Sequence, residues 1–482
     1  MSATATHPAP GHEASARDAR QPWSILFLLG AAQFMVVLDI TVVNVALPSI
    51  GAALGFAAAD LQWVVTIYVL FTGGLLLLGG RLADLFDRRF VFLAGLSLFT
   101  AASLASGLSP SPGALVVARA AQGIGAALLT PAALSIVATT YTGSQLTKAL
   151  STWGAIGSAG AAAGVLFGGV LTTALSWEWV FLINVPVGLA AIALTLRLIP
   201  RGPAAMGDRK LDLPGAVTLV AGLMVLVYAL DGTADHGWGS ARTLLLLALA
   251  GGILAIFAVV ERASRRPLLP PATWRHRSLV SSGAVVLGVT GILVGTFFLN
   301  SLYLQHVLDA SALETGLAFL PLALSIGVAA YAASSLLPRV GSRPLVAGGM
   351  ALVAAGAVAL AAAPDQASYP AHLLPGFLVL GVGMGLVFAG VTVTALSAVP
   401  AEEAGLASGF MATSHELGAA LGVAVLAAIA ATAGDITTVI GIAAGYQDAF
   451  IAAAGIGVAL AAIALWSLPS VRPPRDAAVP VH

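Results

Sequence analysis

The sequence predicts an all-α membrane protein with fourteen transmembrane helices, and three observations support this fold class. Hydrophobic residues make up 59% of the chain and charged residues only 9%, whereas soluble domains carry about 25% charged residues. Fourteen apolar runs are long enough to cross a bilayer, which takes about 20 residues each. The basic residues also gather in alternate connections between these runs.

The predicted spans are arranged as six, two and six. They cover residues 23–48, 61–80, 90–109, 112–137, 149–172, 178–198, 213–231, 243–260, 279–305, 312–337, 344–363, 371–399, 404–432 and 445–468. The longest polar connections flank the middle pair. We therefore predict a disordered tail (1–22), a six-helix bundle (23–198), a linker with two inserted helices (199–278), a second six-helix bundle (279–468) and a terminal tail (469–482).

The positions of the basic residues predict the orientation of the chain. If the N-terminus is cytoplasmic, all but two of the 21 Lys and Arg residues lie on the cytoplasmic side; the exceptions are Arg119, within a span, and Arg242, at an outer end. The opposite orientation would violate the positive-inside rule. We therefore expect a multi-pass protein of the cytoplasmic membrane with both termini in the cytoplasm. The first apolar run is too long for a cleavable signal peptide.

Several functional classes lack their sequence signatures. The chain has no cysteine, which excludes disulfides and thiol chemistry. The outer loop 231–240 holds one histidine and two aspartates, a weak set of metal ligands. No nucleophile elbow, phosphate loop or ATP-binding motif is present. We expect no enzyme, no cofactor, no metal and no nucleic-acid partner, and an ion gradient as the energy source.

The first basic turn, GGRLADLFDRR at 79–89, has a specific order of charges. Its key residues are Gly80, Arg81, Asp84, Asp87, Arg88 and Arg89. The glycines allow close helix approach and a tight turn, and the aspartates can cap the following helix and pair with the arginines. A related turn without acidic residues, VGSRPLVAGG at 340–349, occupies the place that FDRRFVFLAG at 86–95 holds in the first half. This weak repeat predicts two related halves, as in many secondary transporters.

The loop resembles the signature of the major facilitator superfamily, and the resemblance covers most of the chain. Its further segments resemble the fourteen-span drug:proton antiporters of the EmrB/QacA type: LDITVVNVALP, LQWVVTIYVL, ARAAQGIGAALLTPA, SWEWVFLINVPVG and AGLASGFMATSHELGAALGVAVL. The resemblance implies the major facilitator fold, with two six-helix bundles around a central cavity and an inserted hairpin. It also implies alternating access and export of amphiphilic compounds driven by proton entry.

Asp39 and Arg119 are charged residues at bilayer depth. Asp39 lies about nine residues from the outer end of the first predicted span, and Arg119 about seven from that of the fourth, so their depths agree within about one helical turn. A lone charge there costs several kcal/mol, so we expect the two side chains to face the interior near each other, with Gln122 on the same face as Arg119. We interpret them as a proton-coupling site; a static ion pair is the alternative.

His415 and Glu416 form a second titratable site, about twelve residues into the thirteenth predicted span. Adjacent helix positions differ by about 100°, so the two need not point the same way. The related antiporters often have Asn-Thr-x-Arg-Gln where this chain has Ala-Thr-Ser-His-Glu. We predict that Gln122, Asn184, His415 and Glu416 line the substrate cavity. Glu416 is then a counter-charge for a cationic substrate or a second coupling site; packing against a neighbouring helix is the alternative.

The fifth span carries a stripe of small residues. Gly160, Gly164 and Gly168 recur at every fourth position, which gives a flat face for close helix packing. In the antiporters a proline follows the glycine that corresponds to Gly164; here Val165 stands there, so no kink is imposed and antiport is less secure.

We therefore predict proton-coupled efflux of a hydrophobic or amphiphilic small molecule, such as a drug or antibiotic, by a monomer in the lipid bilayer. Import of a solute by proton symport is the second hypothesis, although the acidic-acidic-Arg signature of the fourteen-span peptide symporters is absent from the first span. A membrane enzyme or receptor is a remote third. The sequence does not identify the substrate, because a few polar groups and the cavity shape set specificity.

Overall fold

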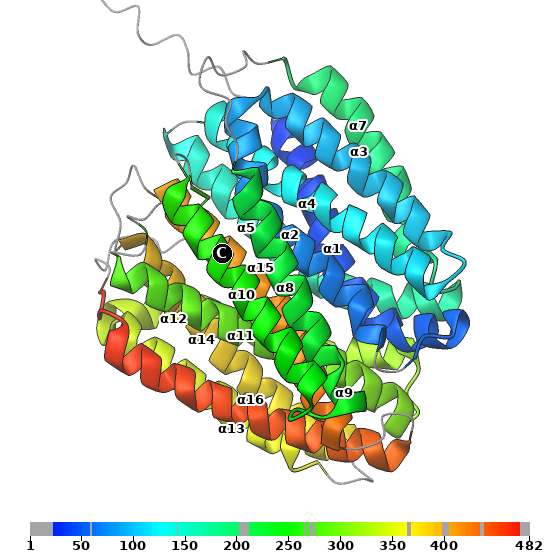
Figure 1. The fold of residues 1–482 in the computed structure, drawn as a ribbon. Coiled ribbons are helices and arrows are strands. Elements are labelled where there is room, and N and C mark those ends of the chain that lie inside the picture. Colours follow the sequence, from blue (N-terminus) through cyan, green and yellow to red (C-terminus); the bar gives the residue numbers. More distant parts are fainter. Residues whose placement is uncertain are drawn as a thin grey trace, which may run out of the picture.

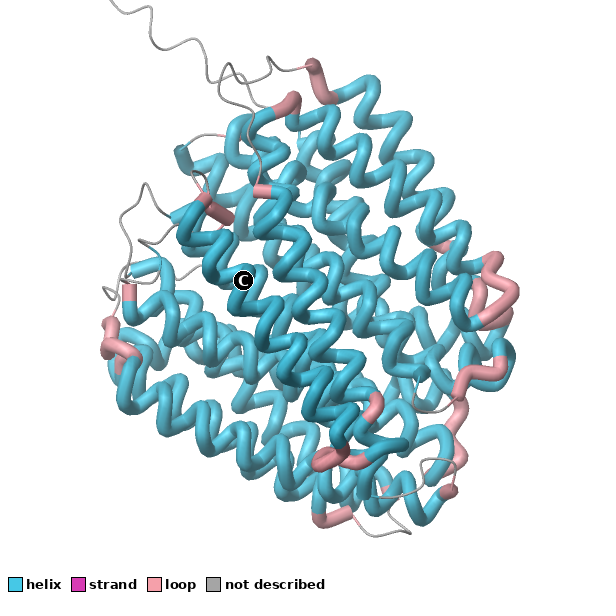
Figure 2. Tube along the Cα trace, in the orientation of Figure 1, coloured by secondary structure: helices cyan, strands magenta, loops and turns pink. Residues whose placement is uncertain are grey.

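The structure is a computed structural model. The residues it describes are 23–57, 60–141, 143–201, 212–264, 267–268, 273, 276–363, 368–397, 404–433 and 438–472. Nearly all of them are helical, and none of them forms a strand (Figure 2). The predicted tail 1–22, the connection 202–211 and the terminal residues 473–482 lie outside the described residues.

The first half of the molecule is a bundle in which α1 packs on α5, and α4 packs on both α2 and α3. Its elements are α1 (Trp23–Leu54), η1 (Asp60–Gln62), α2 (Trp63–Leu85), α3 (Arg88–Gly107), α4 (Pro112–Thr140), α5 (Gly143–Ala174), α6 (Trp179–Leu182) and α7 (Asn184–Leu198). Local sequence explains where α4 begins. Ser111 caps its N-terminus, and Pro112 stands at the first helical position, where its missing N–H costs nothing.

The second half repeats this packing, with α11 on α15 and α14 on both α12 and α13. Its elements are α11 (Arg277–Leu302), the π-helical turn η3 (Tyr303–Val307), α12 (Ala312–Val340), α13 (Ser342–Ala361), the π-helical turn η4 (Tyr369–Leu373), α14 (Leu374–Ser397), α15 (Ala404–Ala433) and α16 (Val439–Ser467). Ser311 and Glu314 form a capping box at the start of α12. Gly341 follows α12 with φ 84°, a backbone conformation that glycine adopts readily.

A pair of glycines marks the same helix crossing in each half. In the first half, a Cβ at Gly95 of α3 would lie 2.9 Å from the carbonyl oxygen of Gly125 in α4. In the second half, a Cβ at Gly349 of α13 would lie 2.8 Å from the carbonyl oxygen of Gly383 in α14. Gly95 and Gly349 end the two repeated segments that the sequence singled out. The two segments therefore occupy equivalent places in the two halves.

The inserted helices α8 (Leu213–Asp231) and α10 (Ala241–Ala263), with the short α9 (Thr233–His236) between them, lie at the junction of the two halves. In Figure 1 they run in green between the blue-to-cyan helices and the yellow-to-red ones. α8 packs against both α2 and α15. The Asp231 carboxylate accepts hydrogen bonds from Gln62 Nε2 at 2.6 Å and Trp63 Nε1 at 3.1 Å, which fastens the hairpin to the first half.

The main contacts between the two halves are those of three helix pairs, α2 with α15, α5 with α12, and α1 with α11. Pro48 determines a contact of the third pair. A proline has no N–H to donate to the carbonyl four residues earlier, here that of Asn44. Ser301 Oγ of α11 donates to that carbonyl instead, at 2.7 Å. Gln305 Nε2 donates to the neighbouring Val45 carbonyl at 2.9 Å.

The predicted fold class is confirmed. Thirteen helical spans among the described residues are long and apolar enough to cross a membrane. The remaining predicted span, 149–172, falls within α5, a helix of 32 residues that packs between α1 and α12. The apolar runs identified helices correctly because burial in lipid requires every backbone group to bond within its own helix.

Candidate functional site

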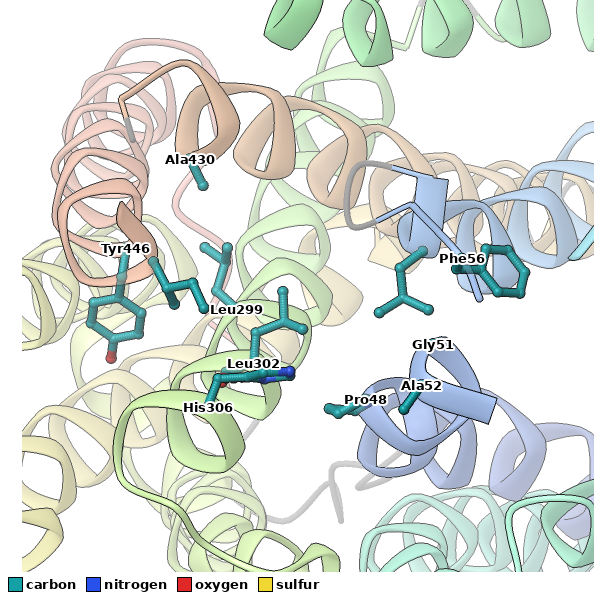
Figure 3. A pocket seen from close by; sticks show the side chains of 11 residues that line it. Pro48, Gly51, Ala52, Phe56, Leu299, Leu302, His306, Ala430 and Tyr446 are labelled. Atoms are coloured by element: carbon teal, nitrogen blue, oxygen red, sulfur yellow. Dashed lines mark hydrogen bonds between the residues drawn. The ribbon is translucent and has the colours of Figure 1, made fainter. Parts of the chain in front are cut away.

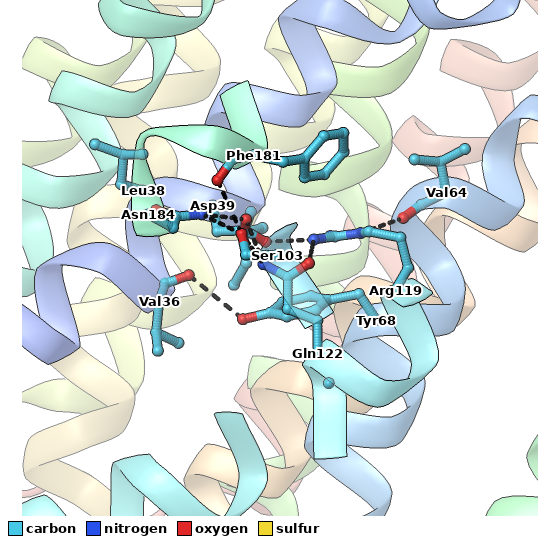
Figure 4. Close-up of polar contacts among 12 residues, drawn as sticks. Val36, Leu38, Asp39, Val64, Tyr68, Ser103, Arg119, Gln122, Phe181 and Asn184 are labelled. Atoms are coloured by element: carbon cyan, nitrogen blue, oxygen red, sulfur yellow. Dashed lines mark hydrogen bonds and ion pairs between the residues drawn. The ribbon is translucent and has the colours of Figure 1, made fainter. Parts of the chain in front are cut away.

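Asp39 of α1 lies at the centre of a buried polar network in the first half (Figure 4). Its side chain has no exposed surface. Oδ2 forms an ion pair with Arg119 Nη1. Oδ1 accepts hydrogen bonds from Gln122 Nε2 at 2.8 Å and from Asn184 Nδ2 at 3.0 Å. One carboxylate therefore joins α1 to α4 and α7, and both of its oxygens are engaged.

Arg119 of α4 is equally buried and is held from three directions. Its Nε donates to the Val64 carbonyl of α2 at 2.9 Å, and Nη1 also donates to Gln122 Oε1 at 2.8 Å. Its guanidinium carbon lies 4.2 Å from the ring centroid of Tyr68, which is cation–π geometry. Nη2 has no hydrogen-bond partner among the described residues. The cation is thus anchored on α2 independently of Asp39.

Ser103 of α3 completes the network. Its hydroxyl accepts from Gln122 Nε2 at 3.1 Å and from Asn184 Nδ2 at 3.0 Å, and donates to the Phe181 carbonyl at 3.0 Å. Sequence reasoning singled out neither Ser103 nor Tyr68. A serine or tyrosine within an apolar span has no distinctive signal; spacing from Gly95 would have pointed to Ser103 only once the helix crossing was known.

The structure places Gln122 and Asn184 beside Asp39 rather than on an open wall. Gln122 is 0% exposed and Asn184 is 2% exposed. The amides of both side chains are committed to the carboxylate and to Ser103. In this conformation the two residues bind the Asp39 carboxylate, whereas the sequence analysis predicted that they line the substrate cavity.

His415 and Glu416 lie on α15, in the second half of the molecule. His415 Nδ1 is 3.5 Å from Glu416 Oε1, and the two side chains are 43% and 17% exposed. Glu416 packs on Gly73 of α2, where an added Cβ would lie 2.5 Å from the Glu416 Cβ. Glu416 Oε2 has no hydrogen-bond partner among the described residues. The pair therefore lies at the junction between the halves.

The basic turn connects α2 to the last helix of the first half. Asp87 caps α3 by accepting from the Arg89 backbone N–H at 3.0 Å, which confirms the predicted capping role. Arg89 Nη2 donates to the Leu196 carbonyl of α7 at 3.0 Å. Arg88 Nε is buried without a hydrogen-bond partner among the described residues. The turn therefore ties three helices together.

The glycine prediction for this turn needs one correction. Gly80 has room, because a Cβ there would meet only Pro131 at 3.7 Å. Gly79 has none, because its Cβ would lie 2.0 Å from the Ala127 carbonyl oxygen of α4. The close approach thus depends on Gly79. Arg81 is half-buried, and the Asp84 side chain lies outside the described residues.

The glycine stripe of α5 packs closely against a neighbouring helix, as predicted, and the structure identifies that helix as α1. An added Cβ would meet the Phe34 carbonyl at 3.1 Å from Gly160, the Leu38 carbonyl at 2.8 Å from Gly164 and the Val42 carbonyl at 2.7 Å from Gly168. The stripe thus follows α1 along the turns on both sides of Asp39, and it holds the helix that carries the carboxylate. The Val165 side chain lies outside the described residues.

A pocket of about 270 Å³ opens elsewhere, between the ends of α1 and α11 and the adjoining parts of α15 and α16. Figure 3 shows Pro48, Gly51 and Ala52 facing Leu302 and His306 across it. None of the four predicted cavity residues lines it. Among the described residues, no group of three or more acidic or histidine side chains could hold a metal ion.

Comparisons with known proteins agree with this architecture. Residues 29–423 match the family model described as the Major Facilitator Superfamily. A puromycin resistance protein of Streptomyces alboniger is 42% identical over 94% of this chain and 92% of its own length. A cephamycin export protein of Amycolatopsis lactamdurans is 41% identical over 91% and 90%. A peptide transporter solved with sulfate has a TM-score of 0.65 at 19% identity and covers 92% of this chain and 94% of its own, which shows a shared fold.

Proposed function

This chain belongs to the major facilitator superfamily, and from that premise we propose that it exports an antibiotic or similar amphiphilic small molecule across the cytoplasmic membrane in exchange for protons. Its relatives are named for puromycin resistance and for cephamycin export, which supports the efflux of antibiotics. We also propose that it works as a monomer with both termini in the cytoplasm, as the basic residues predict, and that it catalyses no chemical reaction.

The observation that carries the proton coupling is the fully buried ion pair of Asp39 and Arg119. Removing two charges from water is rarely repaid in stability, so buried pairs are poor stabilisers. Ionisable groups at membrane depth usually serve transport. A carboxylate on α1 that binds α4 and α7 through three hydrogen-bonding contacts is well suited to a switch, because its protonation changes all of these contacts together.

Protonation of Asp39 would weaken its hold on Arg119, Gln122 and Asn184. Arg119 would stay on α2, because the Val64 carbonyl and the Tyr68 ring hold it independently. The element released is therefore α1. The same helix bonds to α11 and η3 of the other half through the Asn44 and Val45 carbonyls. A proton on Asp39 can thus bias the junction of the halves, which is what alternating access requires.

We assign the substrate-facing role to His415 and Glu416. The two side chains lie at the junction between the halves, keep some exposure, and leave Glu416 Oε2 without a partner among the described residues. A carboxylate there can attract a cationic group of the substrate, or it can carry a second proton. We propose the basic turn, including Asp84, Asp87 and Arg89, as the element that sets the rate of the conformational switch.

The test is export by cells that lack their own pumps. The chain is expressed in such a bacterium, and accumulation of puromycin, a toxic cation such as tetraphenylphosphonium and an acidic antibiotic is measured with and without a protonophore. Lowered accumulation that the protonophore abolishes supports the proposal. Raised accumulation would instead indicate import by symport. No effect on any compound, with the protein present in the membrane, would contradict efflux of amphiphiles.

A further inference from the structure

The pocket between the ends of α1 and α11 lies at the junction of the two halves. The α1 side contributes Pro48, Gly51 and Ala52, and the other half contributes Leu299, Leu302 and Tyr446 (Figure 3). In the proposed orientation all of these helix ends lie on the outer side of the membrane. The pocket contains none of the residues of the Asp39 network, and Pro48 lies nine residues beyond Asp39 along α1.

The walls of the pocket are mostly apolar, so they are suited to a hydrocarbon group rather than to a charged one. The Tyr446 hydroxyl is already used, because it donates to Asn300 Oδ1 at 2.8 Å. His306 is the titratable side chain of the lining, and its Nδ1 lies 3.1 Å from the Leu302 carbonyl. Ligand pockets for drug-sized molecules span about 300–1,000 Å³. A pocket of about 270 Å³ therefore fits the apolar part of such a molecule, not the whole of it.

The pocket also lies next to a hydrogen bond that joins the two halves. Ser301 Oγ bonds to the Asn44 carbonyl, which Pro48 leaves without its intrahelical donor. Pro48 itself forms part of the pocket wall. One proline thus creates the bond between α1 and α11 and shapes the space next to it. When α1 and α11 separate, this bond breaks and the pocket joins the path between the halves.

We propose that this pocket is an exit site, which holds the apolar part of the exported molecule while the outer ends of α1 and α11 open. The inference rests on the proposed export function and adds a second binding place to it. The ligand is the hydrophobic moiety of an amphiphile, such as an aromatic group, with its polar part directed to the outside water near His306.

Cysteine accessibility tests the site, because the natural chain has no cysteine. The variants are Ala52→Cys, inside the pocket, and Ala53→Cys, the next exposed residue of α1, which does not line it. A membrane-impermeant maleimide is applied to intact cells, with puromycin or tetraphenylphosphonium as the probe. At a probe concentration about ten times its Kd, labelling of an occupied site should slow about tenfold.

We expect either probe to slow labelling of Ala52→Cys and to leave Ala53→Cys unchanged. Equal slowing at both positions would show a general closure and overturn the inference. So would unchanged labelling at both positions in cells that export the probe, which leaves the export function standing. If the cells export no compound of the panel, the export function fails and the exit site fails with it.

A pocket-filling variant gives an independent readout. Ala52→Trp should lower the export rate of both probes while the affinity measured from the cytoplasmic side stays the same, because the first binding place is untouched. Ala53→Trp is the matched control and should export normally. Normal export by Ala52→Trp in a folded protein would count against the exit site.

Discussion

The two halves of the molecule share their helix packing but differ in what they place at its centre. Counting six residues back from the equivalent glycines Gly125 and Gly383 leads to Arg119 in the first half and to Phe377 in the second. Both side chains are fully buried. Phe377 packs against other aromatic rings, those of Phe319 and Tyr369. At the equivalent place in the first half, Arg119 forms an ion pair with Asp39.

The equivalence extends to one backbone carbonyl in each half, which accepts a hydrogen bond from a nearby side chain. Arg119 Nε donates to the Val64 carbonyl, four residues before Tyr68, at 2.9 Å. Tyr68 and Leu322 are equivalent, because a Cβ at Gly123 of α4 would lie 2.5 Å from the Tyr68 carbonyl oxygen and one at Gly381 of α14 would lie 2.8 Å from the Leu322 carbonyl oxygen. In the second half the Tyr369 hydroxyl donates to the Ala318 carbonyl at 2.7 Å, and Ala318 precedes Leu322 by the same four residues. A neutral group thus satisfies the fold in the second half. The charge in the first half is more than the packing requires, which favours a functional role.

Arg119→Ala should have the largest effect of these variants, because it removes the buried cation that distinguishes the first half from the second. It leaves the buried Asp39 carboxylate without its cation, which costs about 3–5 kcal/mol of folding free energy. We expect poor yield, a lower unfolding temperature and no export. Adding Asp39→Asn should restore part of the stability, because the stranded charge is gone. If the single and double variants are equally destabilised, the electrostatic pairing is not what holds this centre together.

Asp39→Asn alone should abolish proton-driven export while the protein still folds. The amide keeps the size of the side chain but cannot take up and release a proton. The measurement is protonophore-sensitive efflux together with the unfolding temperature. Phe377→Leu in the second half is the packing control: it alters the place equivalent to Arg119, the ion-pair partner of Asp39, and should retain coupled export. Normal coupled export by Asp39→Asn would remove the coupling role from this residue.

Glu416→Gln should distinguish the two roles proposed for Glu416, a counter-charge for the substrate or a proton carrier. If Glu416 is a counter-charge for substrate, export of tetraphenylphosphonium is lost and export of neutral compounds persists. If it carries a proton, concentrative export of every substrate is lost while exchange down a gradient continues. We favour the counter-charge, because Asp39 is already the proposed proton site. Normal export of all compounds by both Glu416→Gln and His415→Ala would place these residues outside the transport path.

Tyr68→Leu should make the first half resemble the second, where Leu322 holds the equivalent place. It removes the ring against Arg119, and a desolvated cation–π contact is worth about 2 kcal/mol. We expect a moderate loss of stability and of export rate. Tyr68→Phe keeps the ring and should stay close to the parent in both. Equal losses in the two variants would shift the importance to the hydroxyl.

Arg89→Ala and Arg343→Ala should have the smallest effects, and similar ones. Arg89 donates to the Leu196 carbonyl of α7, and Arg343 donates to the Leu468 carbonyl beyond α16. Losing one such hydrogen bond costs about 0.5–1.5 kcal/mol. Thermal unfolding should report comparable losses, and transport should slow without a change in substrate affinity. An effect confined to affinity would contradict the role of the first turn in the conformational switch.

The sequence by itself determined the features that depend on one helix at a time. Apolar runs predicted the spans because hydropathy and helix length are local properties. The shared depth of Asp39 and Arg119 followed from the rise of 1.5 Å per residue. Asp87 as a cap and the spacing of Gly160, Gly164 and Gly168 followed from periodicity within a helix. These predictions agree with the contacts observed.

Only the tertiary structure decided which residues complete each site, because those contacts join distant parts of the chain. Ser103 and Tyr68 enter the network through helix crossings that leave no trace in their own sequence. Gln122 and Asn184 turn toward Asp39 because a buried carboxylate needs donors on both oxygens. Gly79, not Gly80, meets α4 because the crossing fixes the register. The sequence shows that Pro48 leaves the Asn44 carbonyl without its helical donor, but only the structure shows that Ser301 of α11 donates to it instead.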